Sequence, residues 1–452
     1  MKMAEQISLE LAEWALGEAK RNGATAAEVL CVSSESLAAG VRLGAVEKLS
    51  HSRERRIGLR VFTGQSSATA STADLDRESL AEFISHAVQL ARLTAADPWS
   101  GLPEAGLHPK SVPDLELADP DRGLVGAEEA LGIARAAENA ALKFDPRIRN
   151  SEGAEFNSGR GRVMFANSQG FTGEYEGSSF TLVVQPIAQD GDGMQQGFWY
   201  TANRRFAKLE DAESVGVTAA RRALRRLGAR KVKTTRAPVV FEPDVAAGLL
   251  SSLAGAASGP SLYRGASFLL DRLGQAVAAS NVTIVDDGTM PAGLGSKPFD
   301  GEGLPTSRKL VVDKGVLKTY LLDCYSARKL KMQPTGNASR SVGQAPTVAT
   351  TNLYLAPGPY TPEQIIGSVS SGLFVTDLMG FGVNLVTGDY SRGASGIWIE
   401  NGRLSHPVQE ITIAGNLKDM YLAIDMIGND LHWRGSVASP TIKIAEMTVA
   451  GQ

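Results

Sequence analysis

The spacing of apolar residues predicts several helices in the first half of the chain. Residues 7–21 have one apolar face, and Asn22-Gly23 ends the predicted helix. The segments 76–94, 123–143 and 211–227 also combine apolar residues at helical spacing with charged residues between them. These helices are separated by stretches with a different pattern.

Strand-like patterns fill most of the intervening sequence. Ala27–Val32 is apolar and β-branched, and apolar residues alternate with polar or small ones in Ser50–Thr63. Arg147–Tyr200 is dense in Gly, Ser and aromatic residues and predicts antiparallel strands, with a hairpin turn at 167–170. Residues 95–117 are rich in Pro and Gly and predict a loop.

Short β-runs dominate the chain after a predicted boundary at Thr234–Pro238. A strand at Val239–Phe241 precedes a helix that begins at Pro243 and continues to Gly259-Pro260. We therefore expect an α+β protein with a mixed N-terminal α/β part and a β-rich C-terminal domain. The expected domains are 1–118 (α+β), 119–236 (a helix with antiparallel strands) and 237–452 (β-rich, carrying the helix after Pro243).

Composition excludes several classes of protein. The 452 residues suffice for about two or three domains. A formal net charge of −3 gives no global attraction to nucleic acid or to anionic membranes. The chain has five histidines and two cysteines, and none of them forms an HExxH or CxxC motif, which excludes a locally encoded zinc site.

The sequence also indicates a cytoplasmic protein. Cys31 and Cys324 give no disulfide framework and suit a reducing compartment. Acidic residues interrupt the apolar residues of Met1–Gly23, which argues against a signal peptide. No run of about 18 apolar residues exists, so we expect no transmembrane helix.

Two features leave other functions open. A basic run could bind phosphate groups of nucleic acid, although a solvated helix face followed by a linker is the favoured interpretation. His406 and His432 could serve an independent hydrolase, although neither stands beside a recognisable nucleophile motif. The run comprises Arg221, Arg222, Arg225, Arg226, Arg230, Lys231 and Lys233.

Longer segments of the chain resemble the TldD/PmbA family, also called modulator of DNA gyrase proteins. "RIGLRVFTGQSSATAST" is similar to the first domain of that family. The strongest likeness lies in "FDGEGLPTSRKLVVDKGVLKTYLLDCYSARKL" (299–330), "TTNLYLAPG" (350–358), "TGDYSRGASGIWIENGRLSHPV" (387–408) and "MIGNDL" (426–431). The resemblance covers essentially the whole chain.

The resemblance implies a heterodimeric zinc metallopeptidase. Its TldD-like subunit carries an HExxxH motif and a cysteine ligand, and its TldE- or PmbA-like subunit lacks them. Aligning the Leu-Leu pair before the motif puts Ser251, Ser252 and Ala256 at the positions of the first histidine, the glutamate and the second histidine. The segment after Leu431 contains no cysteine. We therefore expect no metal or catalytic residue in this chain, and zinc in a TldD-like partner.

The expected function is that of a non-catalytic PmbA/TldE-like subunit of a peptidase for unfolded or flexible peptides. The chain would form part of the dimer cavity with a TldD-like partner, and in isolation it could form a homodimer. Glycine-rich strands are the candidates for a peptide-facing wall, because glycine allows close backbone approach; they could equally serve turns and bulges alone. These candidates are Gly380, Gly382, Gly388, Gly393 and Gly396.

Overall fold

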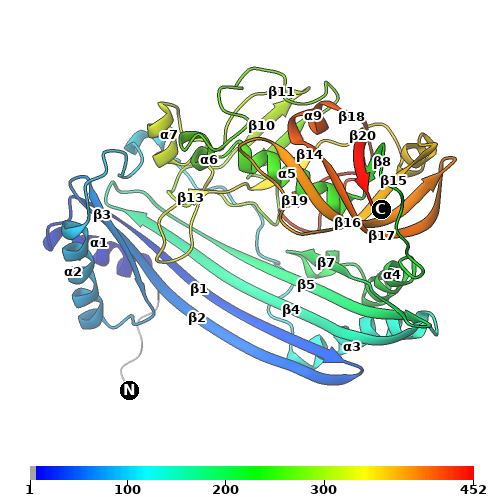
Figure 1. Cartoon of the computed structure of the whole chain (residues 1–452). Coiled ribbons are helices and arrows are strands. Elements are labelled where there is room, and N and C mark those ends of the chain that lie inside the picture. Colours follow the sequence, from blue (N-terminus) through cyan, green and yellow to red (C-terminus); the bar gives the residue numbers. More distant parts are fainter. Residues whose placement is uncertain (1–6, 452) are drawn as a thin grey trace.

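A long antiparallel sheet forms the N-terminal half of the molecule (Figure 1). The computed structural model describes residues 7–451, and within them the strands run in the order β3-β2-β1-β4-β5-β6, with β7 also paired to β5. The bounds are β1 (Ala26–Arg42), β2 (Ala45–Thr63), β3 (Ser66–Thr72), β4 (Ile148–Asn167), β5 (Thr172–Asp190), β6 (Gly193–Gln196) and β7 (Trp199–Asn203).

Two pairs of helices cover opposite ends of one face of this sheet. The helices are α1 (Leu9–Arg21), α2 (Arg77–Leu93), α3 (Ala127–Phe144) and α4 (Ala212–Leu224). Val29 packs in the core with α1 and α2, and Ala39 packs in the core with α3 and α4. Both are odd-numbered residues of β1 and side chains alternate along a strand, so the two helix pairs share one face. We call it the helix face and the opposite one the domain face.

Small residues let the second helix pair approach closely. Gly216 of α4 lies against α3, where an added Cβ atom would be 2.1 Å from the Ala137 carbonyl oxygen. The facing side of α3 is buried and built largely of alanine: Ala130, Ala134, Ala137 and Ala141. This pair therefore depends on the absence of side chains at its contact.

The C-terminal half contains two larger sheets. In the described residues one has the order β11-β10-β9-β14-β19 and the other β17-β16-β15-β8-β20-β18, where a β17–β20 pairing closes a ring of strands. The first comprises β9 (Ile284–Asp287), β10 (Arg308–Asp313), β11 (Val316–Leu317), β14 (Asn352–Leu355) and β19 (Val437–Ala438). The second comprises β8 (Thr235–Phe241), β15 (Ser371–Met379), β16 (Asp389–Glu400), β17 (Arg403–Asn416), β18 (Ile424–Ile427) and β20 (Ile442–Ala450).

Short helices and a small hairpin complete this half. Helix α5 (Pro243–Ala256) lies in the main C-terminal core and contributes its apolar residues to it. The other elements are α6 (Gly259–Tyr263), α7 (Cys324–Leu330), α8 (Pro362–Gly367), α9 (Leu417–Leu422), and the paired strands β12 (Ala338–Ser339) and β13 (Thr347–Val348).

The C-terminal half packs onto the domain face of the long sheet. Phe299 lies over Gly173 of β5, where an added Cβ atom would be 2.6 Å from the ring. Phe299 also forms an aromatic cluster with Phe165 and Phe171. At Gly58 of β2, a Cβ atom would be 2.8 Å from the Gly343 nitrogen, so this glycine admits the loop after β12.

The α+β architecture with a β-rich C-terminal half is confirmed. The helices predicted at 7–21, 76–94, 123–143 and 211–227 are present as α1 to α4. The predicted hairpin turn before β5 is present too, because the Asn167 N–H donates to the Phe171 carbonyl and the Asn167 carbonyl accepts from the Gly170 N–H. The helix after Pro243 ends at Ala256, earlier than expected, and α6 follows. Part of the expectation for Met1–Gly23 falls on residues 1–6, outside the described residues. No helix in residues 7–451 is long and apolar enough to cross a membrane.

Candidate functional site

Helix α5 carries the residues that the sequence places at the metal-motif positions. The Ser251 hydroxyl donates to the Ala247 carbonyl at 3.1 Å, and the Ser252 hydroxyl donates to the Gly248 carbonyl at 3.0 Å. Ala256 is fully buried. Zinc prefers imidazole, thiolate or carboxylate ligands. The residues at these positions therefore do not fit a zinc ion.

The segment after Leu431 lies beside the same helix. The Arg434 guanidinium forms an ion pair with Asp244 in the first turn of α5, with Nη1 and Oδ1 3.3 Å apart. A small cavity of about 60 Å³ between them is lined by His432 and by Ala247. In residues 7–451 no group of three or more His, Cys, Asp or Glu side chains is placed to hold a metal ion. The two segments expected to meet at a metal site are adjacent, and an arginine–aspartate pair occupies their contact.

Arg434 also connects this site to the central part of the chain. Its guanidinium carbon lies 3.9 Å from the Trp199 ring centroid, and that of Arg222 lies 5.0 Å from the same ring. The Trp199 indole donates to Glu210 at 3.0 Å. A tryptophan between two guanidinium groups is a favourable cation–π arrangement. Sequence reasoning missed Trp199 and Arg434, because the two side chains belong to distant segments.

The glycine-rich loop between β15 and β16 approaches α5 as well. Leu385 of this loop lies against Gly255 of α5, where an added Cβ atom would be 3.2 Å from a Leu385 methyl group. The Leu385 carbonyl accepts from the Phe268 N–H at 2.8 Å. The structure thus brings this loop and the motif helix together. Phe381 at the loop is fully exposed.

Four of the candidate glycines are required by the protein's own backbone, either because a side chain would clash or because φ is positive. A Cβ atom added to Gly382 would be 1.7 Å from the Ser391 carbonyl oxygen. A Cβ atom added to Gly396 would be 2.1 Å from the Phe374 carbonyl oxygen. Gly388 has a φ of +89°. Gly380 has a φ of +78° with open space around it, and Gly393 makes only ordinary contacts. A peptide-binding role for the five positions stays a prediction.

The basic run is largely engaged within the chain. Arg222 and Arg225 pair with Glu242 at 2.8 and 3.0 Å, and their side chains are 15% and 25% exposed. Arg226 pairs with Asp377 and Lys231 with Glu410. The interpretation of a solvated helix face is therefore wrong for Arg222 and Arg225, which join α4 to the C-terminal half.

The two histidines considered for a hydrolase lie on different elements. His406 is on β17, where its Nδ1 is 3.2 Å from the Ser405 hydroxyl, and His432 lies beside α5. Partial burial, with the charge of Arg230, lowers the pKa of His406. No carboxylate–histidine–nucleophile arrangement links the two histidines among the described contacts.

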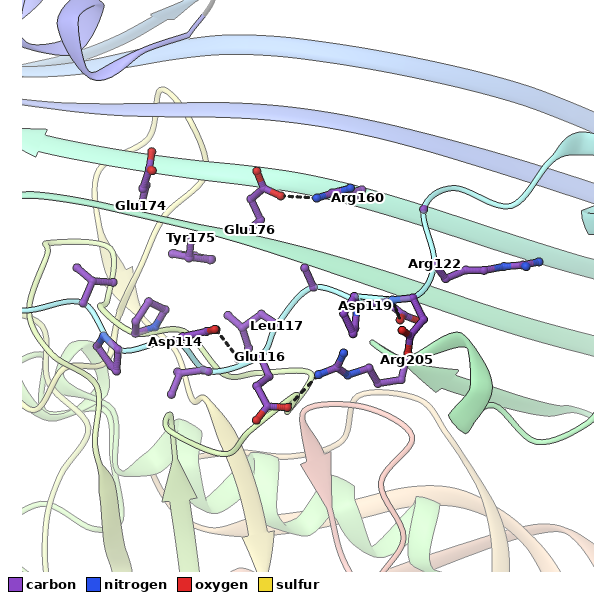
Figure 2. Close-up of a pocket in the computed structure, with 18 residues that line it drawn as sticks. Asp114, Glu116, Leu117, Asp119, Arg122, Arg160, Glu174, Tyr175, Glu176 and Arg205 are labelled. Atoms are coloured by element: carbon purple, nitrogen blue, oxygen red, sulfur yellow. Dashed lines mark hydrogen bonds and ion pairs between the residues drawn. The ribbon is translucent and has the colours of Figure 1, made fainter.

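A charged groove of about 680 Å³ lies beside the edge of β5 (Figure 2). The segment 112–123 forms one side, and the Ser178 N–H donates to the Leu117 carbonyl at 3.0 Å, so this segment covers the edge of the strand. Ion pairs in the lining join Arg205 to Glu116 at 2.9 Å, and Arg160 of β4 to Glu176 of the neighbouring strand β5 at 2.7 Å. The lining carboxylates outnumber the arginines, so the groove suits a cationic ligand better than an anionic one.

A buried acidic group lies at the base of α7. Burial raises the pKa of Glu302 to about 8, and neighbouring Asp300 and Asp323 add to the shift. Glu302 accepts from the Cys324 N–H at 2.8 Å, and burial also raises the pKa of the Cys324 thiol. A thiol held in its protonated form is a poor nucleophile, so Cys324 has a structural role here.

Comparison with known proteins identifies the relatives of this chain. Models of the PmbA/TldA metallopeptidase domain 1, central domain and C-terminal domain match residues 27–91, 121–227 and 234–451. The metalloprotease PmbA of Escherichia coli O157:H7 is 38% identical over 100% of this chain and 96% of its own length. The PmbA homolog of Haemophilus influenzae is 37% identical over 100% of this chain and 98% of its own length.

Solved structures have the same fold. A Bacteroides thetaiotaomicron protein described as a modulator of DNA gyrase has a TM-score of 0.91 and 29% identity over 99% of this chain and 100% of its own. TldE of Thermococcus kodakarensis has a TM-score of 0.87 and 22% identity over 98% and 100%. With full-length relatives above 30% identity, the chain belongs to the PmbA/TldD metallopeptidase family.

Proposed function

We propose that this chain is the non-catalytic, PmbA/TldE-like subunit of a two-component zinc metallopeptidase that acts on unfolded or flexible peptides. The supporting observation is the contact between α5 and the segment after Leu431. The hydroxyls of Ser251 and Ser252 donate to carbonyl groups of their own helix, and Arg434 forms an ion pair with Asp244 beside them. A general base and metal ligands are both missing from these positions. In this proposal the zinc is held by a TldD-like partner.

The partner would bind beside the glycine-rich loop. Phe381 is fully exposed there, and Met379 and Val386 are 53% and 54% exposed. Exposed apolar side chains that gather on one loop favour a protein interface. Gly380 and Gly393, whose surroundings are open or loose, are the candidates for facing a peptide. In isolation the same surface would pair two copies of the chain.

The complex is proposed to work in the cytoplasm. Cys31 and Cys324 are both free and buried, as expected of a protein from a reducing compartment.

The test is an activity assay with metal analysis. The chain alone is expected to hold no stoichiometric zinc and to leave an unfolded casein substrate intact. Mixing it with a TldD-like partner should give cleavage that a chelator abolishes. Cleavage by the chain alone, with zinc bound, would contradict the proposal. A photoreactive peptide should label both subunits of the complex, and labelling confined to the partner would remove the cavity-wall role.

A further inference from the structure

A cavity of about 380 Å³ lies between the domain face of the long sheet and the C-terminal half. Its apolar floor consists of Leu30 and Val32 on β1, Val163 on β4 and the ring of Tyr175 on β5. The rest of the lining comes from the C-terminal half, with Lys297, Asp300 and residues 339–342. The volume falls within the range of about 300–1,000 Å³ that is usual for small-ligand sites.

Arg340 reaches this lining with part of its guanidinium unpartnered. Its Nη1 donates to Glu28 Oε1, and Arg60 Nη1 lies 3.5 Å from the same oxygen. Among the described residues, Nε and Nη2 of Arg340 are buried without a hydrogen-bond partner, although the guanidinium stacks over Phe165. Two guanidinium groups thus share one carboxylate oxygen, and one guanidinium keeps unused donors.

Lys297 adds a second cation to the same lining. Its Nζ donates to the Ala338 carbonyl at 2.9 Å, which uses one of the three donors of an ammonium group. Burial lowers the pKa of Lys297, and the charge of Asp300 opposes this shift. The Asp300 carboxylate already accepts from the N–H groups of Glu302, Leu304 and Ala338.

The cations that line the cavity keep unused donors. Arg340 pairs with Glu28, and Asp300 and Asp286 attract Lys297. Among the described residues, however, Nε and Nη2 of Arg340 have no acceptor, and Lys297 Nζ donates only to one backbone carbonyl. A buried donor without an acceptor is costly, and an anion in the cavity would supply the missing acceptors. The apolar floor beside the cations favours an anion that also carries an apolar group.

We propose that this cavity binds the free C-terminal carboxylate of a peptide that ends in an apolar residue. The carboxylate would lie between Lys297 and Arg340, and the last side chain would lie on Leu30, Val32 and Val163. A C-terminal residue fits because its carboxylate and its side chain branch from one carbon atom, whereas an aspartate or glutamate side chain ends in the carboxylate alone. That the ligand is a peptide rests on the proposed function. The preference for an anion with an apolar group rests on the cavity lining alone.

Direct binding to the isolated full chain tests the site. N-acetyl-leucine and N-acetyl-leucinamide form a matched pair of probes, because they differ in the carboxylate alone. Calorimetric titration is expected to show binding of the acid and at least tenfold weaker binding of the amide. Equal binding of both probes, or binding of neither, would overturn the proposal. Acetyl-Gly-Gly-Leu should bind at least as well as N-acetyl-leucine, and exclusion of this longer acid would overturn the peptide form of the ligand.

Variants connect the binding to the cavity. Lys297→Met should weaken binding of the acid at least tenfold, whereas Lys48→Met, on the same sheet face but outside the cavity, should leave it unchanged. Val32→Phe fills the floor without changing any charge and should also abolish binding, which keeps the test valid if Lys297→Met fails to fold. Retained affinity in either cavity variant would overturn the proposal. No partner subunit is needed, so the result is separate from the peptidase assay.

Discussion

Glu28 and Arg340 form an ion pair between the long sheet and the C-terminal half of the molecule. The side chains are 1% and 3% exposed, and their positions are 312 residues apart in sequence. Glu28 stands near the start of β1, and Arg340 follows β12. This contact and the Trp199–Arg434 stack hold the C-terminal half to well-separated parts of the sheet (Figure 1).

Replacing Glu28 by Gln should strongly destabilise the fold. The variant leaves Arg60 and Arg340 buried without a carboxylate, and breaking one side of a buried pair typically costs about 3–5 kcal/mol. Urea unfolding followed by circular dichroism should show the loss. Glu47→Gln is the control, because Glu47 is 56% exposed and its nearest cation is 4.0 Å away. If the urea midpoint of Glu28→Gln equals that of Glu47→Gln, the ion pair makes no net contribution to the free energy of unfolding.

Glu302 should make stability depend on pH in a definite direction. Burial raises its pKa from 4.5 to about 8. A carboxyl group with a higher pKa in the folded state binds its proton more tightly there, so its contribution to stability is present below about pH 4.5 and is lost as the pH rises to about 8. Glu302→Gln stays neutral and should not lose this contribution.

The comparison is therefore between two pH profiles of unfolding free energy. At pH 8 the Glu302→Gln variant should be more stable than the parent by up to about 5 kcal/mol, since the pKa rises from 4.5 to about 8 and each pKa unit is worth about 1.4 kcal/mol. At pH 4.5 the two should agree, and Glu82→Gln, at an exposed position of α2, should follow the parent throughout. Parallel profiles for Glu302→Gln and the parent would mean that Glu302 is ionised in the folded protein at neutral pH.

Local signals explain why the helices were predicted well. Asp76 accepts from backbone N–H groups at the start of α2, and Asp211 does so at the start of α4. Such caps and the apolar faces behind them are encoded within a few residues. The same holds for the turn at 167–170, where Gly170 has a positive φ.

The long strands were only partly predicted, for a physical reason. β1 continues to Arg42, well beyond the predicted Val32, through Ser33, Ser34 and Ser36. β2 begins at Ala45, and its residues 45–56 are exposed on both faces. A strand with no buried face shows no alternation of apolar and polar residues, so periodicity cannot reveal it.

The candidate site was likewise predicted only in part. The helix after Pro243 followed from the sequence, whereas the metal-motif positions on it stay a prediction from the resemblance. The pairing of Arg434 with Asp244 did not follow from the sequence, because it joins residues 190 positions apart. Long-range polar contacts carry no local pattern in a single sequence.

Two glycines in the α3–α4 pair should respond in opposite directions to alanine. Gly216→Ala places a methyl group 2.1 Å from the Ala137 carbonyl oxygen, and such overpacking typically costs about 1–3 kcal/mol. Gly132 of α3 has nothing within 4 Å of an added Cβ atom, so Gly132→Ala should stabilise the helix by about 0.5–1 kcal/mol. Thermal unfolding of the two variants gives the signs directly. A stabilising Gly216→Ala would mean that the helices can separate at no cost.

The double variant Ser251→Ala/Ser252→Ala tests whether the motif positions take part in chemistry. Both hydroxyls bond to carbonyl groups one turn earlier in α5, which contributes little to a helix and leaves no oxygen directed at a substrate. Unfolding free energy should change by less than about 0.5 kcal/mol, as is usual away from special features. Peptide cleavage by the complex with a TldD-like partner should stay within about twofold of the parent, a change of roughly 0.4 kcal/mol in the barrier. A tenfold loss of cleavage at unchanged stability would place a hydroxyl in the reaction and would contradict the non-catalytic role of this chain.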